Sequence, residues 1–127
     1  MKDASLKEIL PTIPWLRALH FLLSATDGKH IAHCLDLDLV SVGATRAESV
    51  RKLDDLVKAQ IELSLNTGTL VNLATKAPNS FWQEYFAARA IDLEPKSIRI
   101  RVPDIVPIEP SESEIGILAR ERGERAA

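Results

Sequence analysis

The chain has little cysteine and little net charge. Its 127 residues include a single cysteine, Cys34, so no disulfide can form within the chain, and such cysteine usage suits a reducing compartment. The formal net charge is −2, which provides no overall attraction to nucleic acid or to an anionic membrane surface. These two shortages favour a cytoplasmic protein whose fold depends on an apolar core.

Long apolar runs and phosphate-binding loops are also missing. No run approaches the roughly 18 apolar residues of a membrane span, and the first residues lack the apolar core of a signal peptide. No glycine-rich nucleotide-binding motif occurs. The hydrophobic fraction of 46% and the charged fraction of 27% are ordinary for a globular protein, and the length suits one domain. We therefore expect no membrane partner.

Three apolar segments come early in the chain and are predicted to be strands. Residues 16–26 form a long, mostly apolar run that suits a central strand. Asp27-Gly28 then predicts a type I′ hairpin turn, because both central residues of that turn need positive φ. The chain returns as a second strand at 29–35, and a third strand is expected at 37–42.

A long amphipathic helix is predicted after Gly43, which closes the third strand. Thr45 is the expected N-cap, since its hydroxyl can accept the N–H of Glu48 while Glu48 reaches back to the N–H of Thr45. Apolar residues then recur every three or four positions and form one stripe with Leu56 at its margin: Val50, Leu53, Val57, Ile61 and Leu65. We expect this helix to extend to Asn66 and to cover one sheet face.

The segment from Cys34 to Ser49 resembles the HicB antitoxin family. HicB-like sequences show a hairpin, a Cys-Pro-x-Leu-Asp-type segment and a Gly-x-Thr-x-x-Glu-Ala helix start. Here the corresponding stretches are Cys-Leu-Asp-Leu-Asp and Gly-Ala-Thr-Arg-Ala-Glu-Ser, with Leu35 in place of proline and Ser49 in place of alanine. The match covers roughly residues 19–66. It implies an α+β fold, a β-β-β-α partial ribonuclease H-like domain with a three- or four-stranded antiparallel sheet.

Aromatic side chains are concentrated in one short segment. Ser80 and Gln83 have capping-box spacing, so we expect a second short helix over 80–90. Four of the six aromatics of the chain lie in it: Phe81, Trp82, Tyr85 and Phe86. One side of this helix is predicted to fill the core, and the other is a candidate interface, because aromatics are enriched where proteins bind one another.

A C-terminal strand is predicted over 97–102, with Arg99 and Arg101 on its polar side. HicB proteins often carry a C-terminal DNA-binding module, and the ribbon-helix-helix type begins with such a strand. The arginines are therefore candidate nucleic-acid contacts, but this interpretation is disfavoured because Pro107 and Pro110 interrupt the position of the first helix. We expect solvated arginines on the open sheet face instead.

The catalytic interpretations are weak. Asp36 and Asp38 invite comparison with the metal-binding carboxylates of ribonuclease H, but that site also needs an acidic residue on the first strand, and none precedes Asp27. His30 and His33 fall on opposite faces of a strand and are poor joint metal ligands. We predict no catalytic residue, no metal and no cofactor.

The predicted organisation has three parts. Residues 1–15 form an N-terminal arm, residues 16–102 the HicB-like domain, and residues 103–127 a proline-containing charged tail. Within that tail, 113–125 is predicted to be a short charged helix or a frayed end.

The resemblance implies a binding function without chemistry. HicB-type antitoxins mask a small toxin that cleaves messenger RNA, and a neighbouring gene for a small basic protein would favour this interpretation. The alternative is an orphan domain that self-associates through the aromatic helix, and a nuclease is a distant third. We expect a homo-oligomer and no binding of nucleic acid by this chain alone.

Overall fold

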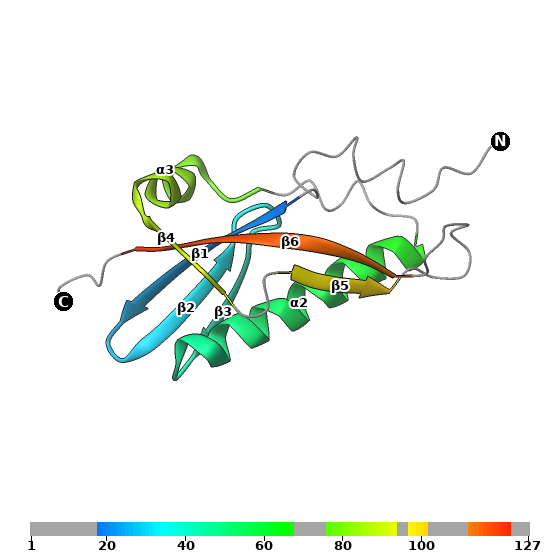
Figure 1. Cartoon of the computed structure of the whole chain (residues 1–127), viewed down its shortest axis with the longest axis horizontal. Coiled ribbons are helices and arrows are strands. Elements are labelled where there is room, and N and C mark those ends of the chain that lie inside the picture. The colour runs from blue at the N-terminus through cyan, green and yellow to red at the C-terminus, as the bar shows by residue number, and fades with distance from the viewer. Residues whose placement is uncertain (1–17, 68–75, 94–96, 102–111, 123–127) are drawn as a thin grey trace.

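The computed structural model describes residues 18–67, 76–93, 97–101 and 112–122 (Figure 1). The elements in chain order are β1 (Ala18–Thr26), β2 (Lys29–Cys34), β3 (Leu39–Gly43), α2 (Arg46–Thr67), α3 (Asn79–Ala87), β4 (Arg89–Ile91), β5 (Ser97–Arg101) and β6 (Glu112–Glu121). The predicted arm at 1–15 and the proline-containing segment 103–111 lie outside the described residues. Within the described ranges, no helix combines the length and apolar character needed to cross a membrane.

The strands form one mixed sheet. Its order is β3-β2-β1-β6-β4, and β5 also pairs with β6. β1 and β6 are parallel, whereas every other described pair is antiparallel. The α+β class is thus confirmed, and β1 is central as expected. The prediction of a three- or four-stranded antiparallel sheet is wrong, because six strands take part and one pair is parallel.

The largest correction concerns β6. The prediction of a short charged helix or frayed end at 113–125 is wrong, since Glu112–Glu121 is the longest of the described strands and lies beside β1. Ile115, Ile117 and Ala119 are buried on one face, while Leu118 is exposed on the other. This alternation has the period of a strand. Charged residues before and after this short apolar stretch favoured the helix prediction.

The first hairpin has the predicted turn. Asp27 and Gly28 have φ of 53° and 74°, as a type I′ turn requires. The third strand starts at Leu39 rather than at residue 37, because residues 35–38 form a turn in which Asp38 has φ of 52°. Aspartate tolerates this left-handed conformation better than most residues.

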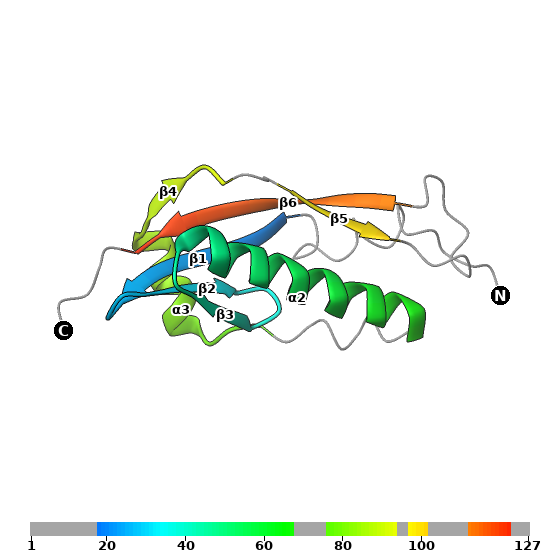
Figure 2. The same cartoon turned by 90° about the horizontal axis from the view of Figure 1, so that it is seen from below.

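Helix α2 covers one face of the sheet, and its predicted apolar stripe is confirmed. All five stripe residues are buried, whereas Leu56 at the margin is 45% exposed. The stripe packs on the buried side chains of β1, β2, β5 and β6 to form the main core. Figure 2 shows α2 running the length of the sheet, from the end of β3 to the level of β5.

Helix α3 lies on the opposite side of the strands from α2 (Figure 1). It packs there in a second, smaller cluster of Leu22, Leu35, Ala77 and Tyr85. The predicted span of 80–90 is too long, since α3 ends at Ala87 and the residues after Ala88 pair with β6 as β4. The capping-box prediction at Ser80 and Gln83 is also wrong: the N-cap is Pro78, whose fixed φ suits a helix start, and no side chain caps the helix.

Candidate protein-binding site

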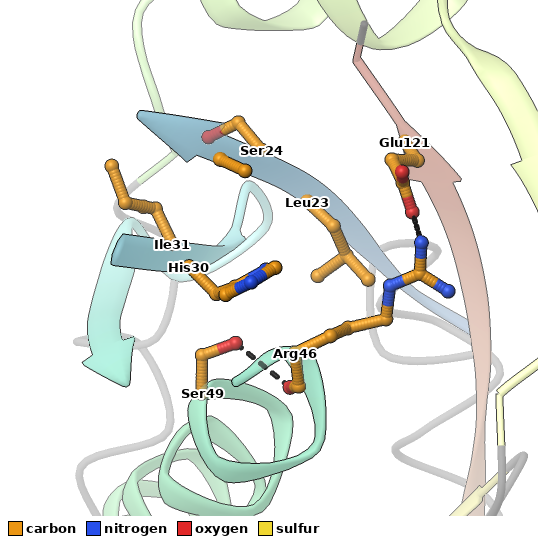
Figure 3. A pocket seen from close by; sticks show the side chains of 8 residues that line it. Leu23, Ser24, His30, Ile31, Arg46, Ser49 and Glu121 are labelled. Carbon is orange, nitrogen blue, oxygen red and sulfur yellow. Dashed lines mark hydrogen bonds and ion pairs between the residues drawn. The ribbon is translucent and has the colours of Figure 1, made fainter. Parts of the chain in front are cut away.

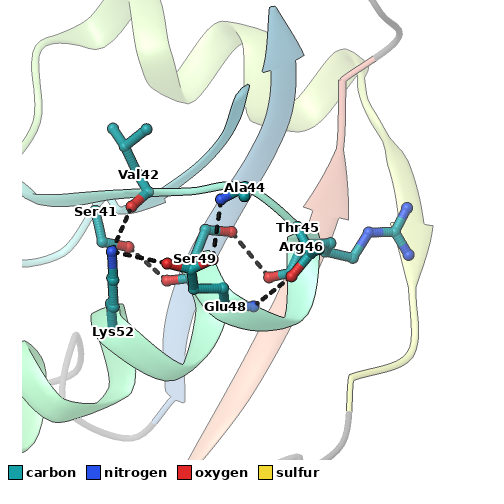
Figure 4. A network of polar contacts seen from close by, with 8 residues as sticks. All are labelled: Ser41, Val42, Ala44, Thr45, Arg46, Glu48, Ser49 and Lys52. Atoms are coloured by element: carbon teal, nitrogen blue, oxygen red, sulfur yellow. Dashed lines mark hydrogen bonds and ion pairs between the residues drawn. The ribbon is translucent and has the colours of Figure 1, made fainter. Parts of the chain in front are cut away.

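The junction of β3 and α2 contains the residues that carried the family resemblance (Figure 4). Thr45 Oγ1 accepts the N–H of Glu48 at 3.1 Å, which confirms Thr45 as the N-cap. The Glu48 carboxylate accepts the N–H of Ala44, one residue earlier than predicted, and pairs with Lys52 at 3.0 Å. The Lys52 hydrogen bond, together with the Ala44 N–H, lowers the pKa of Glu48. Glu48 therefore acts as a cap.

Close approach of β3 to α2 explains Gly43. A Cβ at this position would lie 2.7 Å from the backbone nitrogen of Ser49, which has no room to move. Ser41 Oγ donates to the carbonyl of Ser49 at 2.5 Å, so the first turn of α2 is also tied to β3 by a side chain. These contacts fix α2 relative to the outer strand of the sheet.

The two aspartates considered for metal binding are engaged with different histidines. Asp36 is 1% exposed and accepts the backbone N–H of His20 at 2.6 Å, and its second oxygen lies 2.9 Å from His20 Nδ1. Asp38 lies 2.7 Å from His33 Nε2. In the described part of the chain, no three His, Cys, Asp or Glu side chains are grouped so that they could hold a metal ion. Each carboxylate orients an imidazole.

The lone cysteine is poorly suited to nucleophilic chemistry. Cys34 is fully buried in the main core. Burial, and secondarily the nearby Asp36 carboxylate, raises its pKa to about 12. The reactive species of a cysteine is the thiolate. At neutral pH the side chain is therefore a neutral thiol that serves as core packing.

The histidines held by these aspartates form the platform on which α3 lies. The His20 ring contacts the rings of Trp82 and Tyr85, with centroid distances of 5.3 and 5.4 Å. The His33 ring meets the ring of Phe81 edge-on at 4.8 Å. Such edge-to-face contacts are the favoured geometry of aromatic pairs. Three of the four residues predicted to form an interface, Phe81, Trp82 and Tyr85, therefore pack on histidine rings of the sheet.

The fourth, Phe86, is the most exposed of the large apolar side chains in the described residues. Phe86 is 66% exposed, and Leu118 of β6 is 53% exposed. Tyr85 connects them, since its ring lies 5.5 Å from that of Phe86 and its hydroxyl donates to the Leu118 carbonyl at 3.3 Å. The Arg120 guanidinium lies over the Tyr85 ring at 5.0 Å and donates to the Phe86 carbonyl. We call these four residues the Phe86–Leu118 patch.

A groove of about 330 Å³ adjoins this patch. Tyr85, Leu118 and Arg120 line one side, and β4 with the residues after it lines the other. Burial raises the pKa of Tyr85, so its phenol is neutral over the physiological range. The patch presents the exposed Phe86 ring and Leu118 beside an arginine held in place, and phenylalanine and arginine are enriched at protein interfaces.

The other described cavity lies at the start of α2 and is small (Figure 3). Its volume is about 30 Å³. His30 of β2 and Ser49 of α2 face it, and Arg46 at its rim pairs with Glu121. It has room for water-sized molecules only.

A second exposed surface follows β3, which is the last strand on its side of the described sheet. Val40 and Val42 on its outward face are 48% and 45% exposed. Ser41 between them is buried against α2, so β3 alternates between a solvent face and a core face. An edge strand with exposed valines is unusual, since natural edges are commonly protected by charge or cover.

The two candidate nucleic-acid residues lie on β5. Arg99 is exposed, and its register partner in β6 is Glu114, while that of Arg101 is Glu112. Among the described strands, β5 pairs only with β6 and is therefore an edge strand.

Sequence reasoning missed Leu118 and Arg120, because residues 113–125 were predicted to be outside the fold. The available signal was the alternation of Ile115, Ile117 and Ala119 after a proline-containing stretch. It also missed Asp54 of α2, whose Oδ1 is buried without a hydrogen-bond partner. Burial raises the pKa of Asp54 to about 6.

Comparison of the chain with models of protein families found no match, and searches of curated proteins and of solved structures found none either. The functional inference therefore depends on the surfaces described above and on the resemblance at residues 34–49.

Proposed function

We propose that this chain is a non-catalytic protein-binding domain of the HicB antitoxin type, which masks a small messenger-RNA-cleaving toxin. The Phe86–Leu118 patch is the observation that carries this proposal. Contiguous exposed apolar surface rimmed by polar residues marks protein interaction sites. The Phe86 ring and the Arg120 guanidinium are held by contacts to the Tyr85 ring, so these two side chains lose little freedom on binding.

The arrangement of the first half of the chain supports the family part of the proposal. Three consecutive antiparallel strands lead directly into a long helix that covers one sheet face. This is the β-β-β-α order of the partial ribonuclease H-like domain. The short motif at 34–49 supplies the turn and the helix cap of that unit.

The polar residues of the domain support binding over catalysis. The carboxylates that a nuclease would use make structural contacts instead. Asp36 and Asp38 bind histidine rings, and Glu48 caps α2. A catalytic carboxylate has to face substrate or metal. Asp36, the most buried of them, instead has both oxygens directed at His20.

The proposal predicts that a neighbouring gene encodes a small basic protein, and it is tested with that protein. We expect a complex measurable by titration calorimetry, and Phe86→Asp with Leu118→Asp should weaken it by at least about tenfold, as for interface residues that contribute more than ~1.4 kcal/mol. Leu63→Asp is the matched control, because Leu63 is 57% exposed on α2, on the other side of the sheet. Equal affinity of the patch variant and the control would contradict the proposal.

The orphan alternative, a self-associating domain without a toxin, is favoured by a different observation. The exposed edge of β3 offers backbone groups to a second chain. Self-association through that edge does not exclude toxin binding at the Phe86–Leu118 patch, because the two surfaces are separate.

A further inference from the structure

The backbone groups of β3 that face away from the sheet can be identified from the register. The two-residue turn makes Thr26 and Lys29 a hydrogen-bonded pair, and such pairs alternate along an antiparallel ladder. Lys29, Ile31 and His33 therefore direct their backbone groups to β1, and the intervening residues of β2 direct theirs to Leu39, Ser41 and Gly43. It follows that Val40 and Val42 present their N–H and C=O groups at the outer edge.

One contact confirms this assignment. Lys52 Nζ reaches from α2 to the carbonyl of Val42 at 3.2 Å, which requires that carbonyl to point outward (Figure 4). Lys52 thereby covers one of the edge groups. A lysine at an edge is a common means of limiting unspecific strand pairing.

The outer edge is self-complementary about Ser41. If a second β3 is placed antiparallel with Ser41 opposite itself, Val40 of each chain lies opposite Val42 of the other. Each such pair exchanges two backbone hydrogen bonds, so both outward donors and both outward acceptors of each strand are used. The four valines, exposed in the single chain, then form one apolar cluster of β-branched cross-strand pairs, which stabilise sheets.

The charges on α2 have the same symmetry. Ser41 donates to the carbonyl of Ser49, so the level of Ser41 falls between Glu48 and Lys52 on the helix. These two side chains are one turn apart, 34% and 49% exposed, and Lys52 reaches the β3 edge. A twofold axis at Ser41 brings Glu48 of each chain toward Lys52 of the other, which gives two reciprocal ion pairs.

We propose that two copies of this chain associate through β3, antiparallel about Ser41, into one continuous sheet with the two α2 helices side by side. Helix α2 contacts both β2 and β3, so it lies inward of the edge strand. With strands about 4.8 Å apart, the two α2 axes would lie about 10 Å apart, which is the ordinary spacing of packed helices and brings their long side chains within reach. In the dimer, the Lys52 ammonium leaves the Val42 carbonyl and pairs with the Glu48 carboxylate of the second copy. The proposal does not depend on toxin binding, because it uses a different surface and a different partner.

The register is tested by disulfide cross-linking of the full chain without any partner protein. A mixture of V40C and V42C should cross-link on oxidation, because paired residues of this kind have Cα atoms about 5.5 Å apart, within disulfide range. V40C alone should cross-link little, since its own copies are diagonal neighbours about 7–8 Å apart. The native Cys34 is buried and does not interfere. No cross-link in the mixture, or an equal yield in V40C alone, would overturn the proposal.

The dimer itself is tested by sedimentation at micromolar concentration. The parent chain should sediment at twice its mass of 14.0 kDa. V40P should sediment as a monomer with unchanged circular dichroism, because the lost N–H faces outward and proline is tolerated at such edge positions. V40T keeps that N–H and should remain a dimer. A monomeric parent would refute the proposal, and a dimeric V40P that is folded would do so as well.

Discussion

Removal of the Asp36 carboxylate is the perturbation for which the structure predicts the largest loss of stability at a polar residue. Asp36→Ala takes away the acceptor of the His20 N–H at 2.6 Å and the carboxylate beside His20 Nδ1 at 2.9 Å. Hydrogen bonds to charged groups contribute about 1.5–3 kcal/mol each, and a donor left unpaired in a buried site adds to the loss. We expect the free energy of unfolding to fall by about 3–5 kcal/mol.

The matched control is Asp38→Ala, because Asp38 also orients a histidine but is 36% exposed. Water can replace its carboxylate, but alanine is less suited than aspartate to the positive φ at this position, so the expected loss is about 1–2 kcal/mol. Urea titration followed by circular dichroism measures both, and the midpoint should shift while the slope stays constant. If Asp36→Ala costs no more than Asp38→Ala, Asp36 does not support the structure, and its role as a functional carboxylate would have to be reconsidered.

Three further predictions concern the core, a buried acid and nucleic acid. Val57→Asp places a carboxylate at a fully buried position of α2, at a cost of several kcal/mol, and the variant should be largely unfolded by circular dichroism; a parent-like melting curve would contradict the helix–sheet core. Asp54 has its pKa raised from 3.8 to about 6, so the folded state holds the proton more tightly and stability is lost as the pH rises through this window. Asp54→Asn should therefore raise the free energy of unfolding at neutral pH by about 1–2 kcal/mol, allowing for partial solvent exposure, and should flatten the pH dependence; an unchanged profile would show that Asp54 is solvated. Finally, the chain alone should give no promoter-specific gel shift, and a salt-sensitive shift that is lost on replacing Arg99 and Arg101 by alanine would contradict this expectation.

The first half of the fold could be predicted because its signals are local. The Asp27-Gly28 turn, the Thr45 cap and the apolar stripe of α2 each depend on residues close together in the sequence. Local conformational preferences are strongest at turns and helix caps.

The second half could not be predicted in the same way because its elements depend on distant partners. β6 pairs in parallel with β1 across most of the chain length, and only that pairing fixes its place. β4 is a three-residue strand with no sequence signal of its own, and it ends the helix that the aromatic residues indicated. The Phe86–Leu118 patch joins α3 to β6, so its composition could not be read from either segment alone.

The roles of the polar residues also required the structure. Asp36 and Asp38 are two residues apart in a motif that resembles a metal-binding pair, yet the turn at 35–38 directs them to different histidines. The turn conformation depends on Asp38 adopting positive φ, which the sequence allows but does not require.

The most direct test of the binding function is an RNA-cleavage assay with the small basic protein that the proposal expects a neighbouring gene to encode. Cleavage of messenger RNA by that protein should stop when the purified chain is added in equal amount, and the Phe86→Asp, Leu118→Asp variant should restore cleavage although it remains folded. Cleavage that continues undiminished in the presence of excess folded parent chain would contradict the proposed masking function.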